Sequence, residues 1–416
     1  MTWRHHIRSV AFLGGATVLV KPVWFLFIVA VCPRVLGATA FGHMQTAMAL
    51  GVLALGLADL GISNHTLREV SRAPSEGRRV FRHVVAYRGV FASLAWAGAV
   101  LLAWSAGYEG AAFWSVVAAG GFATMQGFFG LFATFFRAYQ KLNHEAVATV
   151  AERSATIGLG ALALVLVGTP QAVLTGMAVG IGVVVVAQGV WMWRRVLEGS
   201  GGTLSLSFLR AMAWGAVPIG LADFLLMAYL RIDQVMVDGM LGAVAAGQYA
   251  QAYRILEMLS LIPALAIQAV IFPRLARVGA SEDAGVFRRL LRNGLASFAV
   301  GGVAVAGALY LVAPALIRLL TGDPAFAPSA DVLRVLVWTF PFTCMKDLLY
   351  ISSLSQDRVR APILLFGTGL AANVAANVVL LPRFGILGAA YATVGVEVVL
   401  VLTLFLLRPA VLGVRS

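Results

Sequence analysis

Long apolar stretches recur along nearly the whole chain, and polar residues gather in the gaps between them. A bilayer core of about 30 Å requires about 20 apolar residues per spanning helix. The pattern predicts twelve such helices, near residues 10–31, 43–66, 84–106, 111–136, 147–168, 171–193, 208–240, 248–273, 290–313, 330–354, 361–381 and 385–407. The sequence is therefore expected to form an all-α integral membrane protein.

Positive charge alternates between the gaps, and this alternation predicts the orientation of the helices. Of the 31 lysines and arginines, 23 are assigned to the two termini and to alternate gaps, Arg88 and Arg153 among them. The opposite side has only Arg34, Arg318, Arg334 and Arg383, while four cations fall inside spans. Because lysine and arginine are retained in cytoplasmic loops, both termini are predicted to be cytoplasmic.

Composition excludes several classes of protein. Hydrophobic residues make up 60% of the chain and charged residues 12%, far from the balance of a soluble domain. The net charge of +13 is explained by membrane topology, so no nucleic-acid partner is expected. Neither the two cysteines nor the six histidines show metal-binding spacing, and no phosphate-binding loop is present. No cofactor, metal or covalent catalysis is therefore expected, and the short outer connections leave no room for a soluble catalytic domain.

The chain contains an internal repeat. Residues Leu36–Ala47 align at an offset of 205 with Leu241–Ala252, and six of the twelve positions are identical. Since six predicted helices separate the two copies, the copies have the same orientation in the membrane. The repeat predicts two pseudo-symmetric six-helix lobes, 1–200 and 201–416, around a central cleft, as in many secondary transporters.

The seventh predicted span has the densest set of polar groups. An ionised side chain in the hydrocarbon costs about 2.5–3.5 kcal/mol or more, so it normally faces a cavity or a partner. At 100° per residue, four side chains share an arc of about 80° and are expected to line the cleft: Asp223, Arg231, Gln234 and Asp238. The alternative is an ion pair within the helix. Pro218 and Gly220 are expected to break this helix.

The tenth span places Lys346 and Tyr350 on a face with Thr339, Thr343 and Ser353. One cation among hydroxyls and an aromatic ring suits a diphosphate with its adjoining sugar. Alternatively, Asp347 neutralises Lys346, or the lysine reaches the inner surface.

Other spans carry isolated polar residues. Lys21 has no carboxylate in its own helix, so it is expected either to face a water-filled cleft or to have a partner such as Asp59. Arg254 and Glu257 are three residues apart, a spacing that favours a pair. Asn373 and Asn377 share one helix face, where they either bind sugar hydroxyls or link helices, while Glu397 stands alone in the last span.

Four segments together resemble the polysaccharide and oligosaccharide-lipid flippase branch of the multidrug/oligosaccharidyl-lipid/polysaccharide exporter superfamily. They are Ala58–Ile62 with Leu67–Arg72, Arg231–Asp233 continuing to Glu257, Phe272–Arg277, and Pro382–Glu397. The resemblance implies a bacterial inner-membrane transporter that flips polyprenyl-diphosphate-linked oligosaccharide or polysaccharide repeat units by alternating access. It also implies contact with membrane lipid and with a glycan polymerase or other export machinery. Twelve helices, rather than the fourteen usual in peptidoglycan lipid flippases, disfavour that sub-branch.

On this hypothesis the polar side chains divide into two functional sets, with transport driven by the membrane potential or by antiport of H⁺ or Na⁺. The residues expected to bind substrate are Lys21, Arg231, Gln234, Lys346, Tyr350, Arg254, Asn373 and Asn377. The carboxylates expected to couple ion movement are Asp223, Asp238, Glu257 and Asp59.

Two other functions compete with the flippase. A multidrug-type antiporter of organic cations requires an acidic cleft, and seven carboxylates against four cations in the spans point that way: Asp59, Asp223, Asp233, Asp238, Glu257, Asp347 and Glu397. A membrane glycan polymerase or ligase ranks last, because such enzymes need a large outer loop and none here exceeds about a dozen residues.

Overall fold

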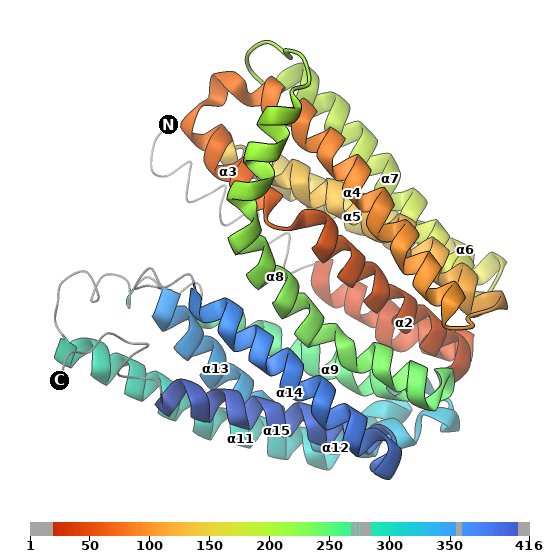
Figure 1. Ribbon diagram of the computed structural model, residues 1–416. Helices are drawn as coiled ribbons and strands as arrows, with labels where there is room; N and C mark the ends of the chain where they lie inside the picture. Colours follow the sequence, from red (N-terminus) through yellow and green to blue (C-terminus); the bar gives the residue numbers. More distant parts are fainter. Residues whose placement is uncertain (1–19, 268–270, 272–273, 275–283, 355–359, 407–416) are drawn as a thin grey trace. The chain divides into compact units, whose positions relative to one another are not determined.

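The computed structural model describes residues 20–267, 271, 274, 284–354 and 360–406, and the described part of the chain contains helices and no strands (Figure 1). Contacts divide the protein into two compact units, Met1–Met227 and Ala228–Ser416. The boundary lies inside one helix, α8. The division into lobes at 200/201 stays a prediction, and that position falls in the connection that precedes α8.

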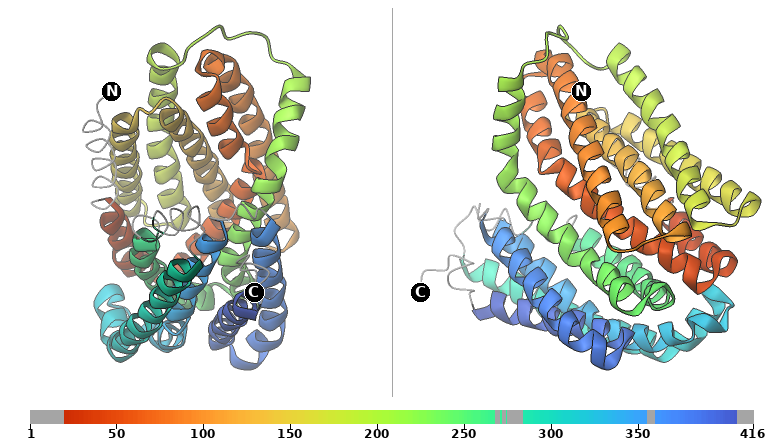
Figure 2. Two further views of the ribbon diagram at one scale, coloured as in Figure 1. Left: turned by 90° about the vertical axis from the view of Figure 1, so that its left-hand side faces the viewer. Right: turned by 45° about the vertical axis from the view of Figure 1, so that its right-hand side comes forward.

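The first unit is a bundle of long apolar helices with one short amphipathic helix, α3, against its side. Helix α7 packs on α5 and α6, and α2 packs on α4 and α5 (Figure 2). Its elements are η1 (Phe27–Val31), α2 (Cys32–Asp59), α3 (Ile62–Arg72), η2 (Pro74–Glu76), α4 (Gly77–Ser105), α5 (Gly110–Ala138), α6 (Leu142–Leu166), α7 (Pro170–Arg195) and the first part of α8 (Leu206–Leu241).

The second unit continues from α8 in the same manner. Helix α15 packs against α13 and α14, and α11 packs against α12 and α13. Its remaining elements are α9 (Ala243–Ala266), α11 (Ala284–Thr321), η4 (Pro324–Phe326), α12 (Pro328–Leu336), α13 (Thr339–Leu354), α14 (Arg360–Phe384) and α15 (Ile386–Leu406).

The all-α membrane fold is confirmed. Within the described residues, eight helical stretches are long and apolar enough to cross a membrane, and the bent helix α8 makes a ninth. One of the eight, Val20–Asp59, contains two predicted spans because its backbone leaves the helical region at Gly37. Helix α9 and the pair α12–α13 carry more polar residues and lie in the eighth and tenth predicted spans. Each of the twelve predicted spans therefore contains helix within its described residues, while residues 10–19, 268–270, 272–273 and 407 of these spans lie outside the described residues.

The two sequence repeats have the same backbone break. Gly37 has φ 71° and ψ 174°, and Gly242, its partner in the repeat, has φ 86° and ψ 175°. Only glycine adopts this region readily, because a Cβ would clash with the backbone. Each glycine therefore lets one helix end and the next begin within a single residue, which is why α9 starts at Ala243 instead of at the predicted residue 248.

Burial also repeats at the same offset. Residues 41–47 and 246–252 have the same succession of buried and half-buried positions, and the half-buried residue of each is the third, His43 or Gln248. Side chains differ in size at several of these positions, as at Phe41 and Ala246. The two copies are therefore equivalent in their packing as well as in their sequence.

Two helix boundaries are set by backbone conformation. The second span was predicted to run to residue 66, but α2 ends at Asp59 because Leu60 and Gly61 are both left-handed, with φ 35° and 82°. The following residues form the separate helix α3, which buries Ile62, Thr66 and Val70. Helix α8 bends by 57° between Leu206–Val217 and Gly220–Leu241, as Pro218 and Gly220 predicted.

We predict that Gly37→Ala and Gly242→Ala each destabilise the protein by about 1–3 kcal/mol, the cost of holding a side chain in this backbone region. A Cβ at either position meets no atom within 4 Å, so crowding does not contribute. The thermal unfolding midpoint of the detergent-purified protein measures the effect. Gly98→Ala is the matched control, because Gly98 lies inside α4 with equally open space around it. Equal midpoints for all three variants would contradict the assignment.

Candidate functional site

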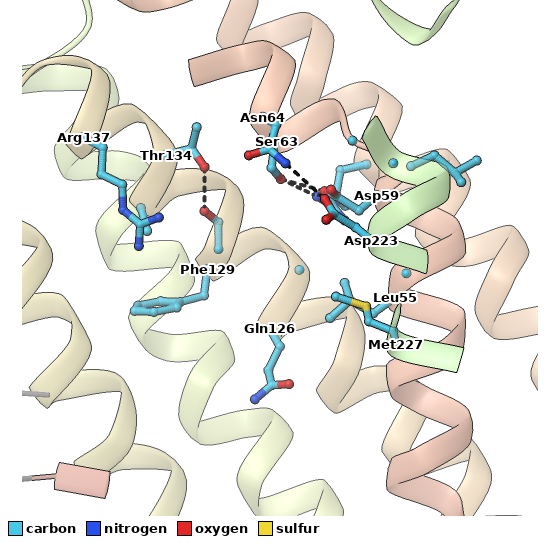
Figure 3. Close-up of a pocket in the computed structure, with 18 of the residues that line it drawn as sticks. Leu55, Asp59, Ser63, Asn64, Gln126, Phe129, Thr134, Arg137, Asp223 and Met227 are labelled. Carbon is cyan, nitrogen blue, oxygen red and sulfur yellow. Dashed lines mark hydrogen bonds and ion pairs between the residues drawn. The ribbon is translucent and has the colours of Figure 1, made fainter. Parts of the chain in front are cut away.

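The first unit encloses a polar pocket of about 360 Å³ where α2 ends, between α3, α5 and α8 (Figure 3). The left-handed residues Leu60 and Gly61 turn the chain from α2 into α3, which places Asp59, Ser63 and Asn64 at the pocket. Asp223 reaches the same pocket from α8, and Asn64 donates a hydrogen bond of 3.1 Å to its carboxylate.

Glycines allow this close packing of two helix breaks. A Cβ on Gly220 would stand 1.8 Å from the carbonyl carbon of Leu60, and a Cβ on Gly61 would stand 2.4 Å from the carbonyl oxygen of Ala216. Both contacts are with backbone atoms, which cannot move aside as a side chain would. The pocket wall therefore depends on the absence of side chains at Gly61 and Gly220.

Asp59 does not pair with Lys21, as the sequence suggested, but with Arg88 of α4. The Arg88 guanidinium donates to Asp59 and, at 3.0 Å, to Ser63, whose hydroxyl also donates to Asp59 at 2.6 Å. Arg88 is only 1% exposed, although its charge had been assigned to an inner loop. It lies eleven residues into α4, which is too deep for a loop position. Lys21 is half-buried and has no ion-pair partner among the described residues.

In the second unit, two arginines share one carboxylate. Arg231 of α8 donates to Glu257 of α9 at 2.6 Å, and Arg254 donates to the same carboxylate at 2.7 Å. The side chains of Arg231, Arg254 and Glu257 are 16%, 18% and 38% exposed. Arg231 and Arg254 lie ten and eleven residues from the helix ends at Gly242, or about 15–17 Å at 1.5 Å per residue. The group therefore lies near mid-depth in its helices.

Asp233 lies at the centre of a buried set of neutral oxygen and amide groups. Asn377 donates to its carboxylate at 2.6 Å, Thr393 at 2.9 Å and Tyr249 at 3.1 Å, and Asn373 accepts from Asn377 at 2.8 Å. Asp233 is 3% exposed and both asparagines are fully buried. The side-chain oxygen of Asn377 has no hydrogen-bond partner within the described structure. These hard oxygen atoms could hold a small cation. In contrast, the described residues contain no cluster of three His, Cys, Asp or Glu side chains that could hold a metal ion.

Lys346 is neutralised, but by Glu397 rather than by Asp347. Its ammonium donates to Glu397 at 2.6 Å, Tyr229 donates to the same oxygen at 2.8 Å, and the Tyr229 ring lies 5.2 Å from the ammonium. Both charged side chains are at most 5% exposed. Glu397, which was expected to stand alone in the last span, therefore has Lys346 as its partner.

The remaining predicted residues are dispersed. Gln234 is buried and donates to the carbonyl of Ala246 at 3.1 Å, and Asp238 is buried and already has a partner. The Tyr350 ring packs edge-on against Phe366 at 5.4 Å. The residues predicted to share one face of α8 therefore do not share one site: Asp223 lies at the pocket, while Arg231 and Gln234 have partners in the second unit.

Sequence reasoning also missed the ion pair between Glu152 and Arg153 in the first unit. Glu152 of α6 is 2% exposed, lies 3.2 Å from Arg153, and accepts a hydrogen bond from Thr156 at 3.2 Å. The Arg153 guanidinium lies 4.9 Å from the Trp24 ring centre. Arg153, like Arg88, had been counted with loop charges. Both residues fall inside predicted spans, 84–106 and 147–168, although their charges were assigned to the gaps.

Comparison with solved structures gives the fold of the whole chain. A multidrug resistance MATE family transporter of the MOP superfamily, in an inward-facing conformation, matches with a TM-score of 0.77 and 15% identity over 96% of each chain. The lipid II flippase MurJ, in an inward closed conformation, matches with a TM-score of 0.72 and 13% identity over 95% of this chain and 86% of the other. A MOP superfamily transporter from Pyrococcus furiosus, described as having a binding pocket of reverse polarity, gives 0.64 and 16% over 98% and 95%.

Family profiles match most of the sequence. The profile of lipid II flippase MurJ matches residues 230–415. A search of curated proteins gave no significant match. The profile of the polysaccharide biosynthesis protein family matches residues 7–278, well over half of the chain. Because this profile covers more than half of the sequence, the chain belongs to the polysaccharide biosynthesis protein family, and its fold is similar to that of the transporters above.

Proposed function

We propose that the protein flips polyprenyl-diphosphate-linked oligosaccharide or polysaccharide repeat units across the bacterial inner membrane by alternating access, with both termini in the cytoplasm. The observation that carries this proposal is the pair of arginines, Arg231 and Arg254, which share the single carboxylate of Glu257. Two guanidinium groups beside one carboxylate suit an anionic head group.

Geometry favours a diphosphate as the ligand. Guanidinium groups bind phosphate oxygens through pairs of hydrogen bonds, and each group keeps its charge at any physiological pH. The three side chains are partly accessible, and Glu257 is the most exposed of them. An arriving diphosphate can therefore replace Glu257 as the partner of one arginine without uncovering a fully buried charge.

The structure reduces the excess of carboxylates that had favoured a cation substrate. Asp59 is paired with Arg88, Glu397 with Lys346, and Glu257 with two arginines. Arg88 lies inside α4 and adds to the four cations that were counted inside the spans from the sequence. An acidic cleft suited to organic cations is correspondingly less supported, although Asp223 and Asp233 have no cationic partner among the described residues.

We place the coupling cation at Asp233 rather than at the four carboxylates first considered. Asp59 and Glu257 are held by arginines, Asp238 already has a partner, and Asp223 lies in the pocket of the first unit. A buried carboxylate with only neutral neighbours is costly unless it binds a cation or a proton. The unpartnered oxygen of Asn377 and the neighbouring Thr393 supply the oxygen atoms that Na⁺ requires.

Two driving forces then act in the same direction. An inside-negative potential favours outward movement of the anionic head by about 2.3 kcal/mol per charge per 100 mV. A cation that enters the cell bound at Asp233 contributes the free energy of its own electrochemical gradient. Membrane lipid surrounds the polyprenyl tail, and a glycan polymerase or other export machinery receives the translocated unit.

We predict that Arg231→Gln and Arg254→Gln each lower glycan export at least tenfold, since a charged hydrogen bond contributes about 1.5–3 kcal/mol. Export of labelled surface glycan, normalised to the amount of protein in the membrane, measures the effect. Arg334→Gln is the control, because Arg334 pairs with the exposed Asp331 at a helix end. Undiminished export by both test variants would refute the proposed phosphate site.

We predict that Na⁺ raises the thermal unfolding midpoint of the purified protein relative to choline at equal ionic strength. A ligand at 100 times its dissociation constant stabilises a folded protein by about 2.7 kcal/mol. Asp233→Asn and Thr393→Val should abolish the difference, and Asp331→Asn should preserve it. Identical midpoints of the wild-type protein in the two salts would remove Na⁺ as the coupling ion.

We predict that Lys346→Met destabilises the protein by about 3–5 kcal/mol, because Glu397 is left buried without a cation. The double variant Lys346→Met/Glu397→Gln should recover most of that stability and retain export, whereas Asp347→Asn should have little effect. A double variant that is stable but inactive would assign Lys346 a direct part in transport.

A further inference from the structure

The pocket of the first unit has the wrong charge for a diphosphate. Two ion pairs lie at its wall, Arg88 with Asp59 and Arg137 with Glu145, and each pair has no net charge. Asp223 then remains, with Asn64 as its hydrogen-bond donor and no cation within ion-pair distance in the described part of the unit. An excess negative charge repels phosphate, so this pocket and the arginine pair of the second unit select different chemical groups.

The pocket presents several hydrogen-bonding groups that are not saturated. Gln126 of α5 makes no hydrogen bond within the described residues, and Asp223 has acceptor capacity beyond its single bond to Asn64. Figure 3 shows Asp59, Ser63, Asn64 and Asp223 gathered on one side, with Gln126 and Phe129 of α5 on another.

The pocket also has room and an apolar surface. Its volume of about 360 Å³ falls within the range of small-molecule sites, and Phe129 contributes an aromatic ring to the lining. Glycines line much of the rest, and a Cβ on Gly130 would meet no atom within 4 Å. The pocket is thus lined by a carboxylate, two amides and an aromatic ring, groups that suit the hydroxyls and the apolar ring face of a sugar.

We propose that this pocket binds an uncharged pyranose residue of the glycan head group, so that the sugar and the diphosphate are recognised at separate sites. The proposal rests on the proposed flippase function and names the class of sugar that the site accepts. Asp223 and the amides of Asn64 and Gln126 bind the hydroxyls, and Phe129 packs against the ring. The same negative charge excludes sugars that carry a carboxylate.

A direct binding measurement tests the sugar site without the lipid. The probes are methyl glycosides of glucose, galactose and N-acetylglucosamine, with methyl glucuronoside as the acidic comparison, and saturation-transfer NMR on the detergent-purified protein detects binding. At least one neutral glycoside should bind, and the glucuronoside should bind at least fivefold more weakly. Gly130→Leu should abolish binding by filling the pocket, whereas Gly98→Leu, at an equally open helical position outside it, should not.

Transport kinetics test the same site in the working protein. Gln126→Ala should raise the KM for lipid-linked glycan about tenfold in proteoliposomes with little change in kcat, and Gln171→Ala should leave both unchanged.

Glycoside binding that survives in Gly130→Leu would overturn the sugar site while export continues to support a flippase. Binding of tetraphenylphosphonium that is lost in Asp223→Asn, without any glycoside binding, would make the pocket a cation site. A wild-type protein that binds glycosides but moves no lipid-linked glycan would refute the flippase function instead.

Discussion

Charge inside the bilayer must be compensated, and this constraint organises the protein more strongly than any single apolar contact. Arg88, 1% exposed, is held by Asp59 and Ser63, and Lys346 is held by Glu397 and Tyr229. Each set joins helices that are separated in the sequence. A buried ion that lost its partner would be strongly destabilising, so these pairs fix which helix faces meet.

In contrast to these neutral ion pairs, the groups of side chains with a net charge are the ones that can bind a charged or polar ligand. Arg231 and Arg254 exceed Glu257 by one charge, Asp233 is surrounded by neutral donors, and Asp223 has a single amide partner. Structural and functional polar residues are therefore distinguished by the local charge sum rather than by depth or residue type. The same criterion moves Lys346 from the substrate-binding residues to the structural ones in our proposal.

The sequence predicts the helices well because hydropathy and backbone chemistry are local. The spans and the bend of α8 at Pro218 and Gly220 follow from neighbouring residues, whereas the one-residue breaks at Gly37 and Gly242 were not predicted. Partners were harder to predict, because they depend on which faces pack together. Lys346 pairs with Glu397, 51 residues away, rather than with the adjacent Asp347, and Asp59 pairs with Arg88 rather than with Lys21. Arg88 was overlooked because it follows a series of arginines in a predicted loop and was assigned to that loop.

The helices on either side of the matching breaks at Gly37 and Gly242 carry different side chains in the two copies of the repeat. At the offset of 205, the counterparts of Arg231, Asp233, Arg254 and Glu257 are Leu26, Ile28, Ala49 and Val52, all of them apolar. The two copies share one backbone frame, but these four ionic side chains are present in only the second of them. The energetic cost of placing this ionic group in lipid is therefore incurred once rather than twice.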